Sequence, residues 1–369
     1  MIRLPQAAPQ LRIKRFRAEI DTAIRQVIDG SHYILGPALE RFEAQFAAYL
    51  GVRHCIGVAS GTDALALALR ALGIGAGDEV ITTALTAAGT AQAILHCGAR
   101  PCFVDVDAVT RCIDPAAVEA AITPRTRAIV PVHLFGHAAD MARLAAIART
   151  HHLALVEDCA QAHGAYSDGR KVGGFGHAGA FSFYPTKNLG GIGDGGAIVS
   201  NDVAFADRVR ALRCYGWNDD HRVSAAVGFN SRLDEMQAAI LGALLPHLDA
   251  GNAERRMLAS HYREALADLG VGLPPDPDGC VYQQFAITCD GRDGLRSHLA
   301  RAGIGTAVHY TPPLHVQPAF ATISIPALPR TEELARRLIS LPIQPEMAGG
   351  EFARAAAAVK EGILQWKMS

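Results

Sequence analysis

Between residues 54 and 201, short apolar runs alternate with segments of helical periodicity, and few folds accommodate this alternation. The runs are too short for most helices and predict buried strands. Most of the intervening segments repeat apolar residues every three or four positions, as amphipathic helices do. We therefore expect an α/β fold in which helices sandwich a mostly parallel sheet. The strand-like runs are HCIGVAS (54–60), DEVITTAL (78–85), ARPCFVDVD (99–107), RAIVPVHLFG (127–136), LALVEDCA (153–160), GAFSFY (179–184) and GAIVSN (196–201).

The pattern changes downstream of this region. RLDEMQAAILGALLPHL (232–248) predicts a long amphipathic helix that leaves the sheet domain, and GLPPDPDG (272–279) is a turn-rich break. We expect a major domain at 30–245 and a smaller α+β domain formed by 1–29 and 246–369. The later strand-like and helical segments are CVYQQFAITC (280–289), LRSHLARAG (295–303) and GTAVHY (305–310).

One lysine in GAFSFYPTKNLGGIGDGG (179–196) follows an apolar run and opens into a glycine-rich turn. A Schiff base to an aldehyde cofactor needs an amine that is partly desolvated, so that its pKa falls. It also needs close approach by backbone, which glycine permits. The pattern predicts that Lys187 is a Schiff-base lysine, and the alternative is a solvated loop lysine.

The segment ALVEDCAQAHGA (154–165) places a carboxylate at the end of a buried strand, where ligands of α/β sheets bind. Pyridoxal 5'-phosphate (PLP) needs a carboxylate against its pyridine nitrogen, and Asp158 fits that role. Gln161 could hydrogen-bond the 3-hydroxyl of the cofactor, and His163 could face the substrate. The alternative for Gln161 and His163 is a polar network beside the strand end.

The segment ASGTDALALALRAL (59–72) places small polar residues before a helical apolar run. Backbone amides of Gly61 and Thr62, with a hydroxyl from Ser60 or Thr62, could bind a phosphate at this helix N-terminus. An ordinary helix cap with Asp63 in the first turn would look similar, and a cap is compatible with a phosphate site.

These segments belong to a set of six motifs that occur in one order along nearly the whole chain. The chain thereby resembles the DegT/StrS-type sugar aminotransferases, which are PLP-dependent enzymes of the aspartate aminotransferase fold (fold type I). The motifs are GSHYILGPALERFE (30–43), SGTDAL (60–65), EDCAQAHGA (157–165), FSFYPTKNLG (181–190), GFNSRLDEMQAA (228–239) and HYTPPLHVQPAF (309–320).

The resemblance implies a role for each residue that matches a family motif. Lys187 would hold the cofactor as a Schiff base and carry the proton between the amino donor and the cofactor. Asp158 would pair with the pyridinium nitrogen. The phosphate would be held by Gly61, Thr62 and Ser182.

Other positions bear on the substrate and on the partner subunit. The resemblance implies that Asn230 reaches the phosphate of a neighbouring subunit, which requires a homodimer with a shared site. It places Tyr310 and His315 near the substrate, with a packed loop at the domain junction as the alternative. The family commonly has an aromatic ring at the position of Ala87, where it stacks on the pyridine. Either aliphatic groups or another residue must supply that face here.

The implied reaction moves an amino group from L-glutamate to a keto-sugar. The expected keto-sugar is a nucleotide-linked 6-deoxyhexose. The YGW segment (215–217) followed by NSRLDE resembles enzymes that act on 3-keto rather than 4-keto sugars. A cyclitol or another non-nucleotide ketone is an alternative acceptor. A non-catalytic PLP-fold regulator is a further alternative, although it would predict loss of Lys187 or Asp158.

Composition restricts the partners and the compartment. A formal net charge of −1 and the lack of basic runs argue against nucleic acid or an anionic membrane as a partner. The eight cysteines form no CxxC pair and the fifteen histidines show no ligand spacing, so we expect reduced thiols and no metal site. Without a leader or an apolar span, the expected location is the cytoplasm.

Overall fold

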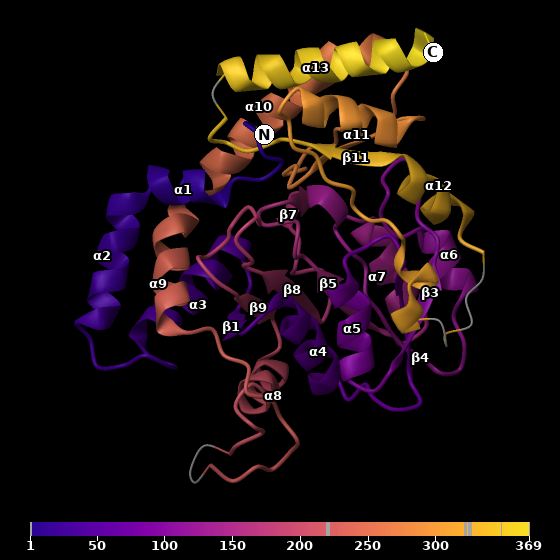
Figure 1. The fold of residues 1–369 in the computed structure, drawn as a ribbon. Helices are drawn as coiled ribbons and strands as arrows, with labels where there is room; N and C mark the ends of the chain where they lie inside the picture. The colour runs from indigo at the N-terminus through magenta and orange to yellow at the C-terminus, as the bar shows by residue number, and fades with distance from the viewer. Residues whose placement is uncertain (1, 219–221, 321–322, 324–326, 348, 369) are drawn as a thin grey trace.

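The computed structural model of the chain describes residues 2–218, 222–320, 323, 327–347 and 349–368. These residues form a central seven-stranded sheet in the order β1-β9-β8-β5-β4-β2-β3 (Figure 1). Strand β9 is antiparallel to both neighbours, and the remaining pairs are parallel. The predicted mostly parallel sheet is confirmed. Its strands are β1 (His54–Val58), β2 (Glu79–Thr83), β3 (Arg100–Val104), β4 (Thr126–Ile129), β5 (Ala154–Asp158), β8 (Ala178–Ser182) and β9 (Gly196–Ser200).

Helices cover both faces of this sheet. They are α3 (Pro37–Leu50), α4 (Gly61–Ala71), α5 (Ala88–His96), α6 (Pro115–Ala120), α7 (Met141–Thr150), α8 (Val203–Leu212) and α9 (Glu235–Leu244). Successive strand residues point to opposite faces. Val156 and Ile198 therefore pack with α4, α5 and α8. Their neighbours face the other way, Leu155 toward α6 and α7 and Val199 toward α3 and α9.

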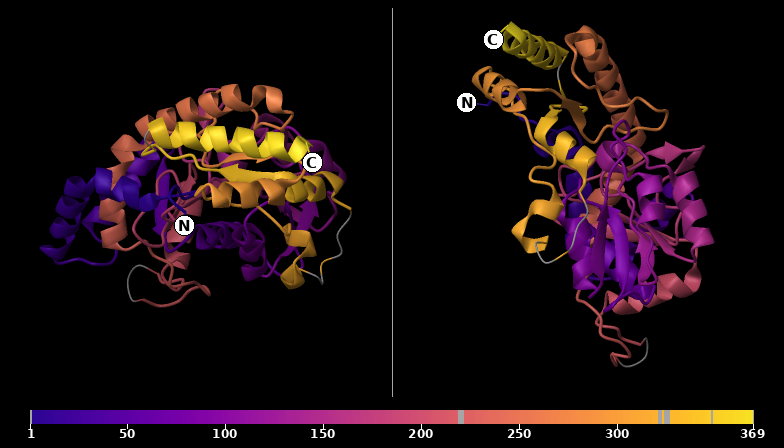
Figure 2. Two further views of the ribbon diagram at one scale, coloured as in Figure 1. Left: turned by 45° about the horizontal axis from the view of Figure 1, so that its top comes forward. Right: turned by 90° about the vertical axis from the view of Figure 1, so that its right-hand side faces the viewer.

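The C-terminal part forms a smaller α+β unit. Strands β10 (Phe285–Thr288) and β11 (Leu338–Leu341) pair antiparallel. They pack against α10 (Leu248–Leu266), α11 (Arg292–Arg301) and α13 (Gly349–Met368) in a separate hydrophobic cluster. Figure 1 and the right-hand view of Figure 2 show these helices gathered at one end of the sheet domain. Within the described ranges, no helix is both long and apolar enough to cross a membrane.

The strand predicted at GTAVHY (305–310) is wrong. Within the described part of this segment, Ala307 alone forms a bridge, and its partner is Ser340. The chain then leaves the small sheet and crosses to the major domain, where the Leu314 N–H donates to the Ala84 carbonyl at 3.0 Å. The prolines at 312 and 313 have no N–H with which to extend a ladder. This crossing carries Tyr310 toward the carboxyl edge of the large sheet.

The first 29 residues, expected with the smaller domain, contact both parts of the molecule. They form helices α1 (Pro9–Arg15) and α2 (Arg17–Ile28). Ile20 of α2 packs in the cluster of α3 and α9, whereas Leu4 packs in the cluster of the small sheet. The N-terminal segment therefore spans the two units on the side where α1 and α10 meet (Figure 1).

Candidate active site

Parallel strands end at one edge of the large sheet, and the predicted site residues follow those ends. Strand β5 ends at Asp158 and β8 at Ser182, while β1 leads to Ser60 and β2 to Ala87. Lys187 lies in the loop after β8. The carboxyl edge is where open α/β sheets bind ligands. The fold thus brings together the lysine, the carboxylate and the expected phosphate segment.

The Lys187 amine is desolvated. Burial lowers the pKa of this amine from its ordinary value of 10.5, and the Asp158 carboxylate only partly opposes the shift. The Lys187 backbone is fixed as well, because its N–H donates to the Tyr184 carbonyl at 2.9 Å. An amine of lowered pKa is a better nucleophile and base near neutral pH. These surroundings favour a cofactor-binding lysine over a solvated loop lysine.

Asp158 is a buried carboxylate that accepts two hydrogen bonds. It is 5% exposed. One oxygen accepts from Thr90 Oγ1 at 2.8 Å and the other from the Ala160 N–H at 3.1 Å. Burial nevertheless raises the pKa of Asp158 above its ordinary value, against the effects of Thr90, Ala160 and Lys187. The neighbouring groups do not fully offset the cost of burying this charge. Such a carboxylate is suited to pair with a ligand cation, such as a protonated pyridine.

Gln161 links this carboxylate region to the crossing segment. Its Oε1 accepts from the Phe135 N–H at 2.6 Å, and its Nε2 donates to the Tyr310 hydroxyl at 2.6 Å. Burial raises the pKa of Tyr310 above its ordinary value, so the hydroxyl stays neutral and keeps a proton to donate. Ala87 stands at the N-cap of α5 and has no ring to offer. Tyr310 is an aromatic side chain that the crossing segment supplies to this site.

His163 lies in an apolar environment. Its ring has no exposed surface and packs 5.4 Å from the Phe181 ring and 5.8 Å from the Phe183 ring, centroid to centroid. Burial lowers the pKa of His163 to about 3, so the imidazole is neutral. Both ring nitrogens are buried without a hydrogen-bond partner among the described residues, so the predicted contact with substrate stays a prediction.

The expected phosphate segment has the geometry of both a cap and an anion site. Ser60 Oγ accepts from the Asp63 N–H at 3.0 Å, which is the predicted cap. The amides of Gly61 and Thr62, the first two residues of α4, have no acceptor within the helix. Gly61 also lies against Ser182, because a Cβ built on it would be 2.6 Å from Ser182 Cβ. Two amides and a serine side chain therefore converge, as an anion site requires.

Replacing Gly61 with alanine should damage this site, because the new methyl group would meet backbone-anchored atoms of Ser182. We expect a loss of about 1–3 kcal/mol in the free energy of unfolding and weaker retention of PLP. The matched control is Gly294→Ala in α11, where a Cβ has open space around it and should be neutral or stabilising. Equilibrium denaturation and cofactor titration measure the two effects, and unchanged PLP affinity in Gly61→Ala would contradict the assignment.

Two predicted residues lie at the margins of the site. Asn230 is exposed beside Ser231, whose hydroxyl donates to the Asp63 carboxylate at 2.6 Å near the start of α4. His315 is in the short turn η4 (Leu314–Val316), with Nε2 3.3 Å from a carboxylate oxygen of Glu332. Glu332 belongs to α12 (Pro329–Arg337), so the His315 contact is with that helix.

Sequence reasoning missed two residues that support the site. Thr90 bonds Asp158 and lies 3.0 Å, oxygen to oxygen, from Thr86. The i, i+4 spacing of two threonines at a helix start was a weak signal for this pair. Arg12 bonds the carbonyl of Lys187 at 2.9 Å across a separation of 175 residues, and no sequence signal pointed to it.

A possible metal-ligand group lies behind Asp158, formed by His133, Glu157 and Cys159. Hydrogen bonds already engage its carboxylate and its ring. Glu157 accepts from three backbone N–H groups at 2.7–2.9 Å and lies 3.2 Å from His133 Nε2. The Ala139 N–H donates to His133 Nδ1, which leaves the ring proton on Nε2, facing Glu157. Burial raises the pKa of the Cys159 thiol well above its ordinary value. These contacts give the group a structural role.

An α/β sheet that brings a desolvated lysine, a buried carboxylate and an anion cup to one edge defines the class of fold type I PLP enzymes. The sequence profile of the DegT/DnrJ/EryC1/StrS aminotransferase family matches residues 14–360. The chain belongs to this family of PLP-dependent transaminases.

Relatives and solved structures agree with this assignment. The chain is 49% identical over 354 residues to dTDP-3-amino-3,4,6-trideoxy-alpha-D-glucose transaminase of Streptomyces venezuelae, covering 94% of this chain and 93% of the relative. It is 47% identical over 347 residues to UDP-N-acetyl-3-dehydro-alpha-D-glucosamine 3-aminotransferase of Acidithiobacillus ferrooxidans, covering 93% and 94%. The crystal structure of S. venezuelae DesV in complex with a ketimine intermediate matches with a TM-score of 0.95 and 47% identity, covering 98% of this chain and 99% of that one.

Proposed function

We propose that this protein transfers an amino group from L-glutamate to a nucleotide-linked 3-keto 6-deoxyhexose. The observation that carries the proposal is the desolvated Lys187 amine beside the buried Asp158 carboxylate. The choice of a 3-keto sugar is supported by the two relatives above, whose names place the amino or keto group at C3. A 4-keto sugar, a cyclitol or another non-nucleotide ketone is the alternative acceptor.

The residues present fit PLP. Gly61, Thr62 and Ser182 would hold its phosphate, assisted by Ser60, because only glycine allows so close an approach of α4 to Ser182. Asp158 would pair with the ring nitrogen, and Gln161 would bond the 3-hydroxyl with the Tyr310 hydroxyl beside it. When bound, PLP would supply an electron sink for the carbanion formed as the donor loses its Cα proton.

Lys187 would carry that proton. Its lowered pKa leaves a larger neutral fraction of the amine near neutral pH than a solvated lysine would have, so it can accept a proton from the donor carbon. The surrounding buried groups exclude water from the transfer. Asp158 would remain ionised against the cationic ring and thereby keep the ring protonated.

A regulatory role is the second candidate. One relative, 46% identical over 342 residues and covering 90% of this chain and 91% of the relative, is named a pleiotropic regulatory protein of Geobacillus stearothermophilus. A protein that only senses PLP or sugar would have no need for both Lys187 and Asp158. Their joint presence as buried neighbours supports catalysis.

The proposal is tested by the absorbance spectrum of the PLP-loaded enzyme before and after glutamate, followed by a dTDP-linked 3-keto 6-deoxyhexose. Glutamate should replace the visible absorbance of bound PLP with the ultraviolet absorbance of pyridoxamine phosphate, and the 3-keto sugar should reverse the change. The 4-keto isomer is the matched control and should act more slowly. A spectrum that ignores glutamate would refute transamination. Reversal by a cyclitol ketone alone would identify the alternative acceptor.

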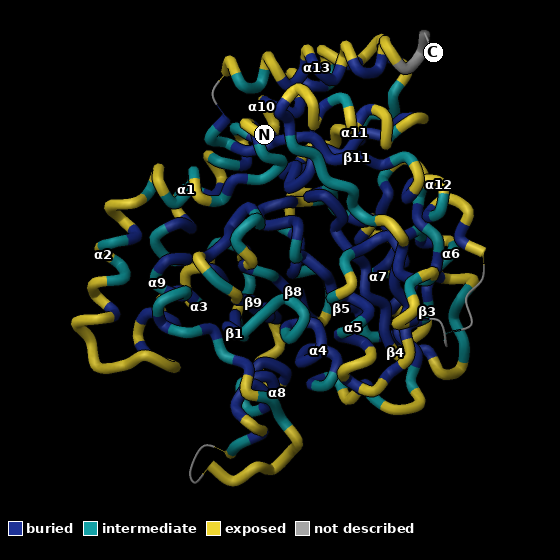
Figure 3. The backbone as a smooth tube through the Cα atoms, in the orientation of Figure 1, coloured by how far each residue is buried: buried dark blue, intermediate teal, exposed yellow. Residues whose placement is uncertain are grey.

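We also infer a homodimer with a shared site. Two loops carry exposed large apolar side chains, Tyr33 and Ile34 before α3, and Tyr215, Val223 and Val227 between α8 and α9. Figure 3 shows yellow, exposed backbone before α3 and beyond α8. Val227 is 77% exposed and Tyr33 59%. Exposed apolar groups of this size are typical of protein interfaces. Asn230 follows directly in the second loop, so a partner subunit docked there would bring it near a phosphate site.

Replacing Asn230 with alanine should therefore weaken PLP binding by about tenfold, the effect of losing one hydrogen bond to a charged group. Mixing Asn230→Ala with Lys187→Ala subunits identifies which subunit supplies the amide. If it acts across the dimer, mixed dimers contain one site with both Lys187 and the amide, and turnover with glutamate returns in that site. If Asn230 acts within its own subunit, no site of a mixed dimer has both, and mixing restores no turnover.

A cytoplasmic location is the remaining part of the proposal. All eight cysteines are free thiols, and seven of them are buried. Reduced thiols at these positions are consistent with a reducing compartment.

A further inference from the structure

A single guanidinium holds the loop that carries the reactive lysine. Arg12, on helix α1, donates four hydrogen bonds to backbone carbonyls of this loop. Nη1 donates to the carbonyls of Lys187 at 2.9 Å and Asn188 at 3.1 Å. Nη2 donates to the carbonyls of Pro185 at 2.8 Å and Gly190 at 2.9 Å. The loop therefore curls around one cation, and the carbonyl of Lys187 itself is part of that shell.

The shape of this loop depends on a glycine at position 190 and on the guanidinium of Arg12. A Cβ on Gly190 would lie 2.6 Å from the carbonyl oxygens of Tyr184 and Pro185 and 2.8 Å from Arg12 Nη2. Four carbonyl dipoles that converge on one point repel one another unless a cation or donors stand between them. The planar fork of arginine can serve several acceptors at once, whereas the ammonium of lysine is a compact point charge.

The helix that bears Arg12 is itself anchored. The next residue after α1, Phe16, stacks on His247 with ring centroids 4.1 Å apart. Upstream, the Leu4 N–H donates to the Gly303 carbonyl at 3.0 Å, and the Gly305 N–H donates to the Leu4 carbonyl at 2.7 Å. These contacts tie the segment to the turn just before α10 at one end and to the smaller domain at the other.

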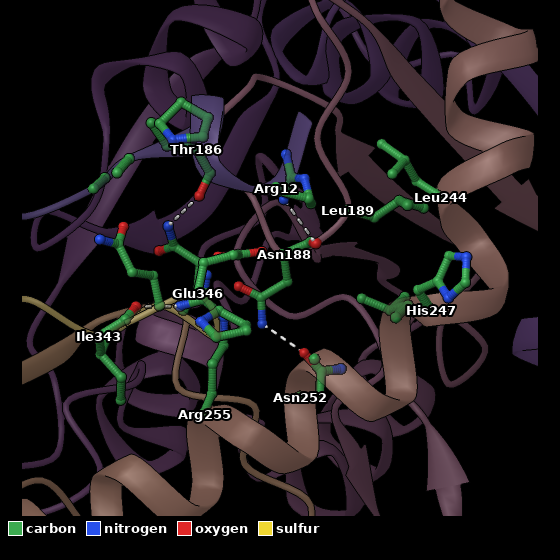
Figure 4. Close-up of a pocket in the computed structure, with 18 of the residues that line it drawn as sticks. Arg12, Thr186, Asn188, Leu189, Leu244, His247, Asn252, Arg255, Ile343 and Glu346 are labelled. Atoms are coloured by element: carbon green, nitrogen blue, oxygen red, sulfur yellow. Dashed lines mark hydrogen bonds between the residues drawn. The ribbon is translucent and has the colours of Figure 1, made fainter. Parts of the chain in front are cut away.

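Figure 4 shows Arg12 beside Asn188 and Leu189 at the wall of a cavity that Asn252 and Arg255 also line. Asn188 is held from the far side, because its Nδ2 donates to Asn252 Oδ1 at 2.8 Å. The lysine loop is thus gripped between α1 and α10. A cavity next to the guanidinium also gives small solutes a route to its position.

We propose that Arg12 is a positioning residue, which holds the backbone of Lys187 so that the amine meets the reacting carbon in the productive orientation. This inference rests on the proposed function. It predicts a defect in proton transfer rather than in binding, because the hydrogen bonds of Arg12 among the described residues go to the loop backbone and not to the groups assigned to the phosphate or the ring.

The test compares Arg12→Ala and Arg12→Lys in the PLP-loaded enzyme with Arg15→Ala as the matched control. Arg15 lies on the same helix and makes an exposed ion pair with Glu254, 43% and 30% exposed, which should contribute little. We expect Arg12→Ala to lower the single-turnover rate with glutamate by about 100-fold, the cost of misplacing a reacting group by about 1 Å. The KM for glutamate should change little. The single-turnover rate of Arg12→Lys should fall between those of Arg12→Ala and wild type.

Chemical rescue separates positioning from a general loss of structure. Millimolar guanidinium should enter the cavity and restore part of the Arg12→Ala rate, while urea at the same concentration should not. Equal rates in Arg12→Ala and wild type would overturn the inference. The inference would also be overturned if the Arg12→Ala rate fell in proportion to its loss of bound PLP and guanidinium restored none of it. A wild-type enzyme whose spectrum ignores glutamate would instead defeat the proposed function, so the two failures are distinguishable.

Discussion

Replacing Lys187 with alanine should abolish amino transfer while leaving the fold intact. The variant would lack both the amine proposed to join the cofactor and the base proposed to move the proton, and we expect the rate to fall on the order of 10⁴-fold. The phosphate cup and Asp158 remain, so PLP should still bind. Single-turnover spectra with glutamate measure the rate, and cofactor titration measures the binding.

The matched control is Lys171→Ala. Burial lowers the pKa of Lys171 as well, but its amine donates to the Tyr49 carbonyl at 2.9 Å and stands 3.3 Å from the centroid of the Tyr49 ring. This variant should keep wild-type turnover. Borohydride reduction of the PLP-loaded enzyme followed by peptide mapping should place the cofactor on Lys187. A label on Lys171, or turnover retained in Lys187→Ala, would show that the wrong lysine was assigned.

Replacing Asp158 with asparagine should lower the rate by about 100-fold or more and make the cofactor-free protein more stable. The buried carboxylate is costly without a cation beside it, so the neutral isostere should raise the free energy of unfolding by about 1–2 kcal/mol. Thr90 can accommodate the amide, because its hydroxyl can turn to Thr86 and accept from the new N–H.

The stability gain should depend on pH in a defined direction. The folded-state pKa of Asp158 is raised, so the carboxyl contributes stability below its ordinary value of 3.8, and this is lost as pH rises through the folded pKa. Wild type and Asp158→Asn should therefore be alike at low pH and diverge toward neutrality. Urea unfolding of both cofactor-free proteins across that range checks this. A less stable asparagine variant at neutral pH would mean that the carboxylate is fully compensated.

Asp158, Ser182 and Lys187 could be placed together from the sequence because strand periodicity is local and parallel strands share a carboxyl edge. Each residue lies at or just beyond the end of an apolar run, so recognising the runs was enough to bring the three to one edge. The cap at Ser60 followed from the same local logic.

Contacts between distant segments could not be predicted in this way. The Gln161–Tyr310 bond spans 149 residues and depends on a segment that was misread as a strand. His163 has the motif position of a site residue, but its ring contacts are with Phe181 on β8 and Phe183 just beyond that strand. Arg12 is one of three arginines between residues 12 and 17, and nothing in the spacing separates it from Arg15 or Arg17.

The two-ended attachment of the N-terminal segment sets an order for completing the active site during synthesis. Arg12 leaves the ribosome before the lysine loop does. Gly303 and Gly305, which anchor Leu4, emerge long afterward. The large sheet can assemble from its own local units while the chain is still growing. The contacts that hold Arg12 against the lysine loop are complete only when the smaller domain has folded. A nascent chain should therefore form its cofactor-binding residues into a site before Lys187 reaches its full rate of proton transfer.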